Sequence, residues 1–584
     1  MRNAVHKIRK INIYLMLILL IIFGIFQYGI YKICGFTLVP DEFGYWSSAA
    51  RTVGYDWSPV ASLGSYYSFG YSFLLIPILK LFQNGVTTYR AALFLNMLLM
   101  CAGVILMQEI LKRMFPEMGK VKSALVSGAA VLYPSWIFYM QMTMTEALLM
   151  FLFVFITWLF ICLIQKTKAA IAASLAVALI YIYCVHMRTV GVLIACVITL
   201  FLWMVSEHPN FKTVITFWGV LLLFILLAVV MKQNTITEVF ANADAQTLSV
   251  NDYGNQWEKI RQIFTIHGVR QFAREVMAKV FYLGLASFGI FYWGLGFTVK
   301  KVVSLVKKFF RKEKGNEVEW TALFLLLSVT GEILIGSIFM FQSRMIDTLI
   351  YGRYDEFVAP VFILIGIAAM SRSRWLFRGT LLMGTGTGLF IPVIINQIEK
   401  RNLAGIRGYM VAGISYLLKE DEPNVYLFFR DTWILCFEVM ILCALFVWLS
   451  GKNKNAAWIL SGIIVIEIAA GLQISSHYTY PVNNSNFMDL SIAEAIEEKS
   501  RPGNSVLYLD EGKPEYIDFI QMQLGKKTIE VIGEEQLELI EGKAENIFLI
   551  THKDTFCKDR LENIFDNCLA ANTFYLFYND CMED

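Results

Sequence analysis

Long apolar runs separated by short polar connections dominate this chain. Runs of about 17 to 25 apolar residues have the length of a membrane-spanning helix. About thirteen runs meet this rule, near residues 11–33, 86–108, 121–142, 145–165, 169–186, 188–206, 212–232, 279–299, 319–341, 355–371, 379–396, 431–450 and 456–474. The first run follows a basic start, as in a signal peptide, but no small-residue cleavage site follows it. We therefore predict an α-helical polytopic membrane protein whose first span is retained.

Lysine and arginine residues gather in every second connection. Starting from "RNAVHKIRK" at the N-terminus, alternate connections are short and basic, and the most basic is 300–314. Basic connections stay in the cytoplasm, so we predict a cytoplasmic N-terminus. We interpret 300–314 as a topology signal, with recognition of lipid headgroups as the alternative. The other connections and the polar tail are then extracytoplasmic: 34–85, 233–278, 342–354 and 397–430.

Two external segments and the tail are long enough to have structure of their own. The segments 34–85 and 233–278 exceed ordinary connectors, and "QWEKIRQIFTIHGVRQFAREVMAKVF" has the amphipathic pattern of interfacial helices. In the tail, "SVLYLD", "KTIEVI", "NIFLIT" and "TFYLFY" read as short strands between polar helical stretches. We therefore predict a transmembrane domain over 1–476 and a small extracytoplasmic α/β domain over 477–584.

The composition supports a membrane protein and excludes several other classes. The chain of 584 residues is 57% hydrophobic and 17% charged, and its mean hydropathy is +0.56. A net charge of +3 is too small to indicate a nucleic-acid partner. The sequence has no CxxC pair and no metal-ligand spacing, so we expect no metal cofactor. Cys557, Cys568 and Cys581 in the tail permit at most one disulfide, which stays open.

An adjacent acidic pair, Asp41 and Glu42, follows the first apolar run at the predicted outer edge of the membrane. Ionisable groups at such a place are expensive to desolvate and mark functional sites. A helix-capping or loop-solvating pair is the alternative interpretation. Pro40, which fixes a turn before the pair, and the pattern "DEFGY", which puts Tyr45 one helical turn further on, favour a general base.

With this "DEFGY" pattern, its many apolar runs and its polar tail, the chain resembles the GT-C superfamily of integral-membrane glycosyltransferases. The resemblance is to the branch that contains protein O-mannosyltransferases and lipid A aminoarabinose transferases, and it covers the whole layout, although the motif is short. It implies a GT-C-like fold of about thirteen helices with an external α/β domain. It also implies that Asp41 and Glu42 in the first external loop are catalytic.

The second half of this loop adds candidates for substrate binding. The stretch "GSYYSFGYSFLLIPIL" is similar to the tyrosine-containing part of the family's loop that approaches the sugar and phosphate of the donor, which implicates Tyr66 and Tyr67. Family members often have a Glu-Lys pair before a proline here. This chain has Phe69, Gly70 and Tyr71 instead, so the phosphate must find its cation elsewhere.

One further acid and one tyrosine belong to the predicted site. Glu146, in "MTMTEALLMFLF", begins a helix at the outer side, where the family has an acid in a similar place. An N-cap formed with Thr145 is the alternative. We expect Tyr45, Glu42 and Glu146 to orient the acceptor or to tune the base.

Three external arginines are candidates for holding a phosphate, because a leaving phosphate gains charge as the glycosidic bond breaks. Arg188 lies between two apolar runs, and Arg344 and Arg353 lie near the start of a late one. The stretch "YGRYDEFVAP", which includes Tyr354, is similar to late helices of the superfamily. A solvated loop arginine is the alternative for each.

The resemblance implies an inverting glycosyltransferase of the bacterial cytoplasmic membrane. It would move a sugar from a polyprenyl-phosphate donor to a hydroxyl of a glycan, glycolipid or protein on the outer face, in cell-envelope biosynthesis. No cofactor is expected, although some relatives use a divalent metal. A lipid-linked oligosaccharide flippase or a polysaccharide polymerase is the alternative; a transporter would show pseudo-repeats and a site at the bilayer midplane.

Overall fold

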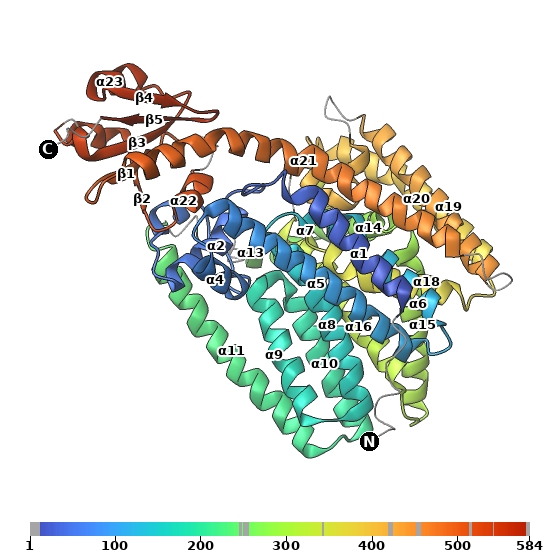
Figure 1. Ribbon diagram of the computed structural model, residues 1–584. Coiled ribbons are helices and arrows are strands. Elements are labelled where there is room, and N and C mark those ends of the chain that lie inside the picture. The colour runs from blue at the N-terminus through green and yellow to red at the C-terminus, as the bar shows by residue number, and fades with distance from the viewer. Residues whose placement is uncertain are drawn as a thin grey trace, which may run out of the picture.

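The computed structural model describes residues 12–243, 248, 256–341, 344–418, 424–450, 457–512, 517–540 and 542–579. The chain forms a large helical bundle that carries a small β-sheet at one end (Figure 1). The basic N-terminal stretch that supports the predicted orientation lies in residues 1–11, outside the described residues.

Nine helices of the described residues are long and apolar enough to cross a membrane, which makes the chain a multi-pass membrane protein. They are α1 (Ile13–Ile30), α5 (Gly85–Met114), α8 (Thr145–Lys166), η1 with α10 (Met187–Thr189 and Val190–Glu207), α11 (Phe211–Val239), α16 (Glu317–Phe339), α19 (Leu376–Arg401), α20 (Val425–Ser450) and α21 (Ala457–Lys499). Each overlaps one of the predicted apolar runs.

Two bent helix pairs bring the number of spans in the described residues to as many as eleven. They are α6 (Lys120–Val131) with α7 (Pro134–Met140), bent by 63°, and α14 (Ile266–Ala286) with α15 (Ile290–Phe310), bent by 118°. The predicted span 279–299 crosses the second bend, so it is not one straight helix. There Phe288 and Gly289 have positive φ angles of 51° and 72°, which end one helix and start another.

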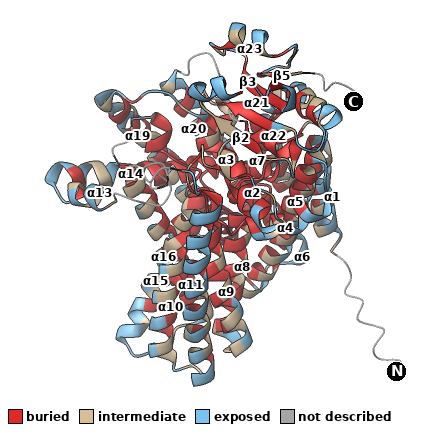
Figure 2. Ribbon diagram, turned by 90° about the vertical axis from the view of Figure 1, so that its left-hand side faces the viewer, coloured by how far each residue is buried: buried red, intermediate tan, exposed pale blue. Residues whose placement is uncertain are grey.

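Two predicted spans are shorter apolar helices in the structure. They are α9 (Ala169–Val185) and η2 with α18 (Glu356–Val358 and Ala359–Met370). Every residue of α18 is buried, so this helix lies inside the bundle rather than against lipid. The predicted number of thirteen spans is therefore not confirmed by length and composition, although each predicted run has helical residues. Figure 2 shows burial concentrated in the middle of the molecule, while α11 and α13 expose one side.

Short helices form the segments that were predicted to be external. The first segment contains α2 (Asp41–Thr52), α3 (Ser58–Ala61) and α4 (Ser72–Leu81); later segments contain α13 (Gln256–Ile263), α17 (Ile346–Leu349) and η3 (Gly408–Leu417). The amphipathic stretch predicted to form interfacial helices is helical, as α13 and α14.

The C-terminal residues form a five-stranded sheet in the order β2-β1-β3-β5-β4, which confirms the predicted small α/β fold. The strands are β1 (Ser505–Leu509), β2 (Ile529–Ile532), β3 (Ile547–His552), β4 (Asn567–Ala570) and β5 (Phe574–Tyr578). β1 pairs in parallel with β2 and β3, and β5 pairs antiparallel with β3 and β4. Four strands match the predicted ones, and β4 was missed.

Helices accompany the sheet and join it to the bundle. They are α22 (Asp518–Leu524), α23 (Lys558–Ile564), η5 (Glu534–Leu539) and η6 (Ala544–Asn546). The long α21 leads out of the bundle to the sheet and runs through residue 477, where we placed the domain boundary (Figure 1). Among the tail cysteines, Cys557 and Cys568 are free thiols, and Cys581 lies outside the described residues.

The sheet end of the molecule packs on the loop between α1 and α5. The Nε1–H of Trp57 donates a hydrogen bond of 2.7 Å to the carbonyl of Gly525. In α21, the side-chain oxygen of Asn483 accepts from the backbone N–H groups of Cys34 and Gly35, at 2.8 and 3.0 Å. These contacts hold the loop that carries the acidic pair.

Candidate functional site

A polar cavity of about 170 Å³ lies where four segments between the apolar helices meet. Its lining residues are Asp41, Tyr45, Tyr66, Tyr67, Ser68, His186, Phe339, Tyr351, Arg353, Tyr354 and Met410. Six of these were predicted from the sequence: Asp41, Tyr45, Tyr66, Tyr67, Arg353 and Tyr354. Residues more than three hundred positions apart therefore meet at one site.

Helix α2 presents Asp41 to the cavity. Pro40 precedes the helix, and the two acids stand in its first turn, where a negative charge complements the helix dipole. The side chain of Asp41 is 27% exposed, and its Oδ1 accepts a hydrogen bond of 2.9 Å from the hydroxyl of Tyr67. Burial and the neighbouring Asp41 charge raise the pKa of Tyr67 well above its usual value, so this hydroxyl keeps its proton.

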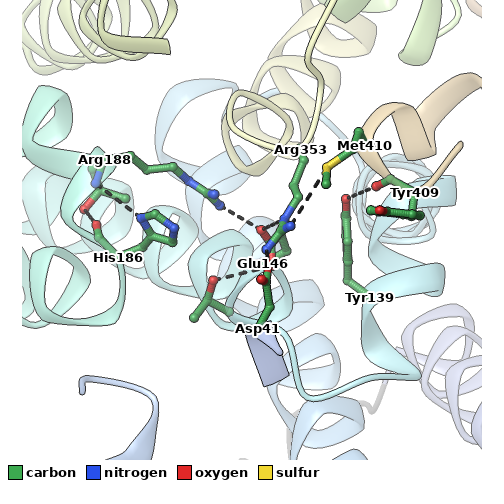
Figure 3. Close-up of polar contacts among 10 residues, drawn as sticks. Asp41, Tyr139, Glu146, His186, Arg188, Arg353, Tyr409 and Met410 are labelled. Atoms are coloured by element: carbon green, nitrogen blue, oxygen red, sulfur yellow. Dashed lines mark hydrogen bonds and ion pairs between the residues drawn. The ribbon is translucent and has the colours of Figure 1, made fainter. Parts of the chain in front are cut away.

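Arg353 joins the two acids of the site (Figure 3). Its Nη2 lies 2.6 Å from Oδ2 of Asp41, and its Nε lies 2.8 Å from Oε1 of Glu146. The backbone of the same loop is fixed because the N–H groups of Gly352 and Arg353 both donate to the carbonyl of Met410. Only glycine fits at 352, since a Cβ there would lie 2.0 Å from the ring of Tyr282.

Arg188 completes the charged group. The break between α9 and α10 places it inside the molecule, where its Nη2 lies 3.1 Å from Oε1 of Glu146. Its guanidinium carbon lies 4.6 Å from the centre of the Tyr354 ring, in cation–π contact. Glu146 thus binds both arginines, beyond the N-cap role that was its alternative.

The charges of this group balance, with two carboxylates and two guanidinium groups. Burial acts to lower the pKa of Arg353, but the carboxylates of Glu146 and Asp41 outweigh it and raise that pKa well above its ordinary value. Burial, together with the charges of Arg188 and Arg353, holds the pKa of His186 well below its usual value. The ring of His186 is therefore neutral at pH 7, and its Nδ1 accepts from the backbone N–H of Arg188 at 3.3 Å.

Glu42, the second predicted catalytic acid, does not line the cavity. Its Oε1 accepts from the backbone N–H groups of Thr37 and Leu38, at 2.7 and 2.9 Å. Its Oε2 accepts from the hydroxyls of Tyr89 and Thr143, both at 2.6 Å, and from the Thr143 backbone at 2.7 Å. Burial raises the pKa of Glu42. These contacts stabilise the loop between α1 and α5 on the side away from the cavity.

Arg344 also lies apart from the cavity. Its side chain is exposed, and its carbonyl accepts from the backbone N–H of Ala404 at 3.1 Å. Sequence reasoning missed several lining residues, among them Tyr351, Phe339 and Met410. Tyr351 belongs to the "YGRY" stretch and could have been found with Arg353, whereas Phe339 and Met410 stand in no motif.

An apolar cavity of about 260 Å³ adjoins the polar one, and the two share Tyr66 and Ser68. Its other lining residues come from α9, α10, α11 and the loop before α4: Phe69, Ile180, Tyr183, Cys184, Met187, Val190, Leu193, Ile225, Ala228, Val229 and Lys232. The Nζ of Lys232 lies 5.7 Å from the centre of the Tyr66 ring. A cation therefore stands beside the junction of a polar and an apolar cavity.

Within the described residues, no group of three or more His, Cys, Asp and Glu side chains could hold a metal ion. The expectation that no cofactor is required stays a prediction.

Comparison with known proteins supports the fold. No family model matches the sequence, and no curated protein sequence matches it. Among solved structures, ArnT from Cupriavidus metallidurans bound to undecaprenyl phosphate is similar with a TM-score of 0.52 and 13% identity, over 96% of this chain and 97% of that chain. The apo state of the same protein has a TM-score of 0.51 and 14% identity, over 97% and 98% of the two chains. Over nearly its whole length, the chain therefore has the fold of this ArnT structure, which agrees with the fold predicted from the sequence.

Proposed function

We propose that this chain is an inverting glycosyltransferase that moves a sugar from a polyprenyl-phosphate donor to an acceptor hydroxyl at the outer face of the membrane. The observation that carries the proposal is the joined pair of cavities. One is polar and contains an acid that can act as a base, and the other is apolar and lies between membrane helices. The similar ArnT structure contains undecaprenyl phosphate, a ligand of this chemical class.

The two cavities fit the two ends of such a donor. The prenyl chain would occupy the apolar cavity among α9, α10 and α11, and the sugar would lie in the polar cavity. The phosphate would then sit near Tyr66 and Ser68, the residues that both cavities share, within reach of Lys232 and Arg353. These cations take the place of the Glu-Lys pair that the sequence lacks.

Donor binding would also free the base. In the resting site, Arg353 is held by both Asp41 and Glu146, at 2.6 and 2.8 Å. A phosphate offers the guanidinium a second anion of matching geometry. When the phosphate takes the place of Asp41 on Arg353, that carboxylate loses its cation and becomes a better proton acceptor. Glu146 and Arg188 would keep the rest of the guanidinium in place.

Asp41 would then act as the general base. Its carboxylate takes the proton of the acceptor hydroxyl while the hydroxyl oxygen attacks the anomeric carbon from the face opposite the phosphate. The bond between that carbon and the phosphate oxygen breaks, and the phosphate leaves with the electron pair. Arg353 and Lys232 stabilise its growing charge, so no general acid is needed. The anomeric configuration is inverted.

The same observations weigh against the alternative functions. A polymerase would bring an oligosaccharide into the site, whereas the polar cavity holds about 170 Å³, which suits a single sugar. A flippase would bind near the bilayer midplane. Here the charged residues of the site come from loops and helix ends, as with Asp41 in the first turn of α2 and Glu146 in the first turn of α8.

We propose the bacterial cytoplasmic membrane as its location, with the N-terminus in the cytoplasm and residues 477–584 as an extracytoplasmic domain. The acceptor would be a glycan, glycolipid or protein of the cell envelope. A membrane-impermeant thiol reagent should label Arg501→Cys and not Lys312→Cys in intact cells, in a variant that lacks Cys568 and Cys581. Labelling of Lys312→Cys alone would show that the orientation is the opposite of the proposed one.

The activity is tested with purified protein in lipid vesicles and a panel of polyprenyl-phosphate sugars. We expect one of them to yield free polyprenyl phosphate and an inverted glycoside. Asp41→Asn should abolish this release, while Asp56→Asn should not. Asp56 is exposed in the same loop and accepts from the N–H and hydroxyl of Ser58, a role that asparagine also fills. Unchanged release with Asp41→Asn would remove this residue from the base role.

A further inference from the structure

Two apolar cavities lie against α14, away from the charged site. The first holds about 350 Å³ and the second about 250 Å³, and both are lined by Val276 and Val280 of α14. The first continues between α15 and α19, where Tyr292, Gly386 and Phe390 line it. The second continues between α15 and α16. Two apolar spaces therefore flank the start of α15, under one stretch of α14.

The N-terminal half of α14 is amphipathic and lies at the surface of the protein. Exposed apolar side chains there are Ile266, which is 79% exposed, and Val269, which is 52% exposed. Arg270 and Arg274 are exposed on the adjoining side of the helix, one turn apart. Nη1 of Arg274 lies 3.3 Å from Oε1 of Gln397 in α19, which directs this arginine over the helix that lines the larger cavity.

Helix α13 extends the same pattern. Trp257 in α13 is 77% exposed, and Phe264, directly after this helix, is 80% exposed. Figure 2 shows α13 projecting from the side of the bundle. Aromatic and apolar side chains beside arginines are typical of a helix in the interface between lipid headgroups and acyl chains. The bend of 118° after α14 turns this helix away from the direction of α15.

We propose that this region binds one anionic diacyl phospholipid. The two cavities would each take an acyl chain, on either side of α15, and Arg270 and Arg274 would hold the headgroup phosphate. The cavities fit acyl chains because their lining side chains are almost all apolar, and the arginines select an anionic headgroup by charge. The site is separate from the proposed donor site and does not depend on the proposed reaction.

The bound lipid would support the loop that carries Arg353. Further along α14, the Nζ of Lys279 donates to the carbonyl of Thr348 at 3.4 Å, and the hydroxyl of Tyr282 donates to Glu356. These contacts stand on both sides of Arg353 in sequence. A lipid that fills the space under α14 therefore stabilises the helix on which this loop rests.

Cavity filling tests the acyl-chain part of the proposal. Gly386 lines the larger cavity, and a side chain there would meet no atom within 4 Å of its Cβ. Gly386→Leu should therefore fold normally and occupy the space of the acyl chain. Gly462→Leu is the matched control, because Gly462 is exposed in α21, also has open space and lines neither cavity.

The measurement is native mass spectrometry of the detergent-solubilised protein during titration with phosphatidylglycerol or phosphatidylcholine. We expect one tightly held phosphatidylglycerol on the wild type and on Gly462→Leu, and at least tenfold weaker retention on Gly386→Leu. Equal retention on the two leucine variants would overturn the site, as would binding of a single-chain anionic lipid as tight as that of the diacyl lipid.

Neutralising the arginines tests the headgroup part. A cation near an anionic lipid contributes about fivefold in binding, so Arg270→Gln with Arg274→Gln should weaken phosphatidylglycerol binding by about thirtyfold. Binding of phosphatidylcholine should change little. The control is Lys526→Gln with Lys543→Gln, two exposed cations beside the sheet. An equal loss for both lipids, or the same loss in the control, would contradict selection of the headgroup by these arginines.

Discussion

Asp41 and Glu42 are adjacent residues of α2, but they have different surroundings. Asp41 belongs to the charged group around Arg353, whereas Glu42 is the centre of a hydrogen-bonded group. Asp41 faces a cavity and is paired with a cation, which a ligand can take over. Glu42 faces the protein and accepts five hydrogen bonds from neutral donors of three segments. The difference teaches that a carboxylate whose partner a ligand can replace is suited to catalysis, whereas a carboxylate with all its hydrogen bonds made inside the protein stabilises the fold.

The largest expected effect separates the two acids by activity. Asp41→Asn should lower kcat by about 10² to 10⁴-fold, the usual contribution of a general base. The same change removes the anion that competes for Arg353, so polyprenyl phosphate should bind about tenfold more tightly. Turnover assays and titration with polyprenyl phosphate measure the two effects. Weaker binding of the lipid phosphate would contradict the exchange of partners on Arg353.

Removal of the Arg353 guanidinium should also lower activity, because it takes the cation away from Asp41 and from the leaving phosphate. Arg353→Gln should lower kcat by about 10² to 10³-fold, because a charge-stabilising donor is lost where the phosphate leaves. Arg353→Lys should recover only part of this, since lysine cannot bridge two anions in the same plane. Arg344→Gln is the control, as Arg344 is exposed and does not line the cavity. A similar loss of kcat in Arg353→Gln and Arg344→Gln would contradict a specific role of Arg353 in stabilising the leaving phosphate.

Glu42→Gln should act on stability rather than on chemistry. The amide would turn an N–H₂ group toward donors, either at Tyr89 and Thr143 or at the loop backbone. Each unsatisfied buried group costs about 1–3 kcal/mol. The apparent Tm, followed by tryptophan fluorescence in detergent, should fall clearly in Glu42→Gln and little in Asp41→Asn. Equal shifts in Tm would erase the distinction between the two acids.

Tyr67→Phe should lower activity by less than the changes at Asp41 and Arg353, and it concerns the same charged group. It removes one neutral hydrogen bond to Asp41, worth about 1 kcal/mol, so kcat should change by about fivefold with little change in Tm. Turnover assays with saturating donor measure it. A loss as large as that of Asp41→Asn would instead make Tyr67 part of the proton transfer.

The smallest expected effect concerns metal ions. If guanidinium and ammonium groups neutralise the leaving phosphate, extensive dialysis against EDTA should leave kcat unchanged. Loss of turnover that returns with Mg²⁺ or Mn²⁺ would show that the charged group alone does not suffice.

Much of the architecture could be predicted because its signals are local. A run of apolar residues predicts a helix wherever that helix packs, although not that it spans the membrane, and short alternating stretches predicted four of the five strands. The bend between α14 and α15 could not be predicted, because "FYLGLASFGIFYWGLGF" stays apolar through it. β4, "NCLA", is a short strand whose alternation of partly buried and exposed residues carries little sequence signal.

The candidate site divides in the same way. The sequence by itself determined that acids and arginines stand at the ends of apolar runs, because each such residue is visible beside its own helix. Only the tertiary structure decided that Arg353 and Arg188 meet at Glu146, that Arg344 stays outside, and that Glu42 turns away from Asp41. The physical reason is that the length and hydropathy of an apolar run belong to one segment of the chain, whereas an ion pair needs two segments that packing brings together.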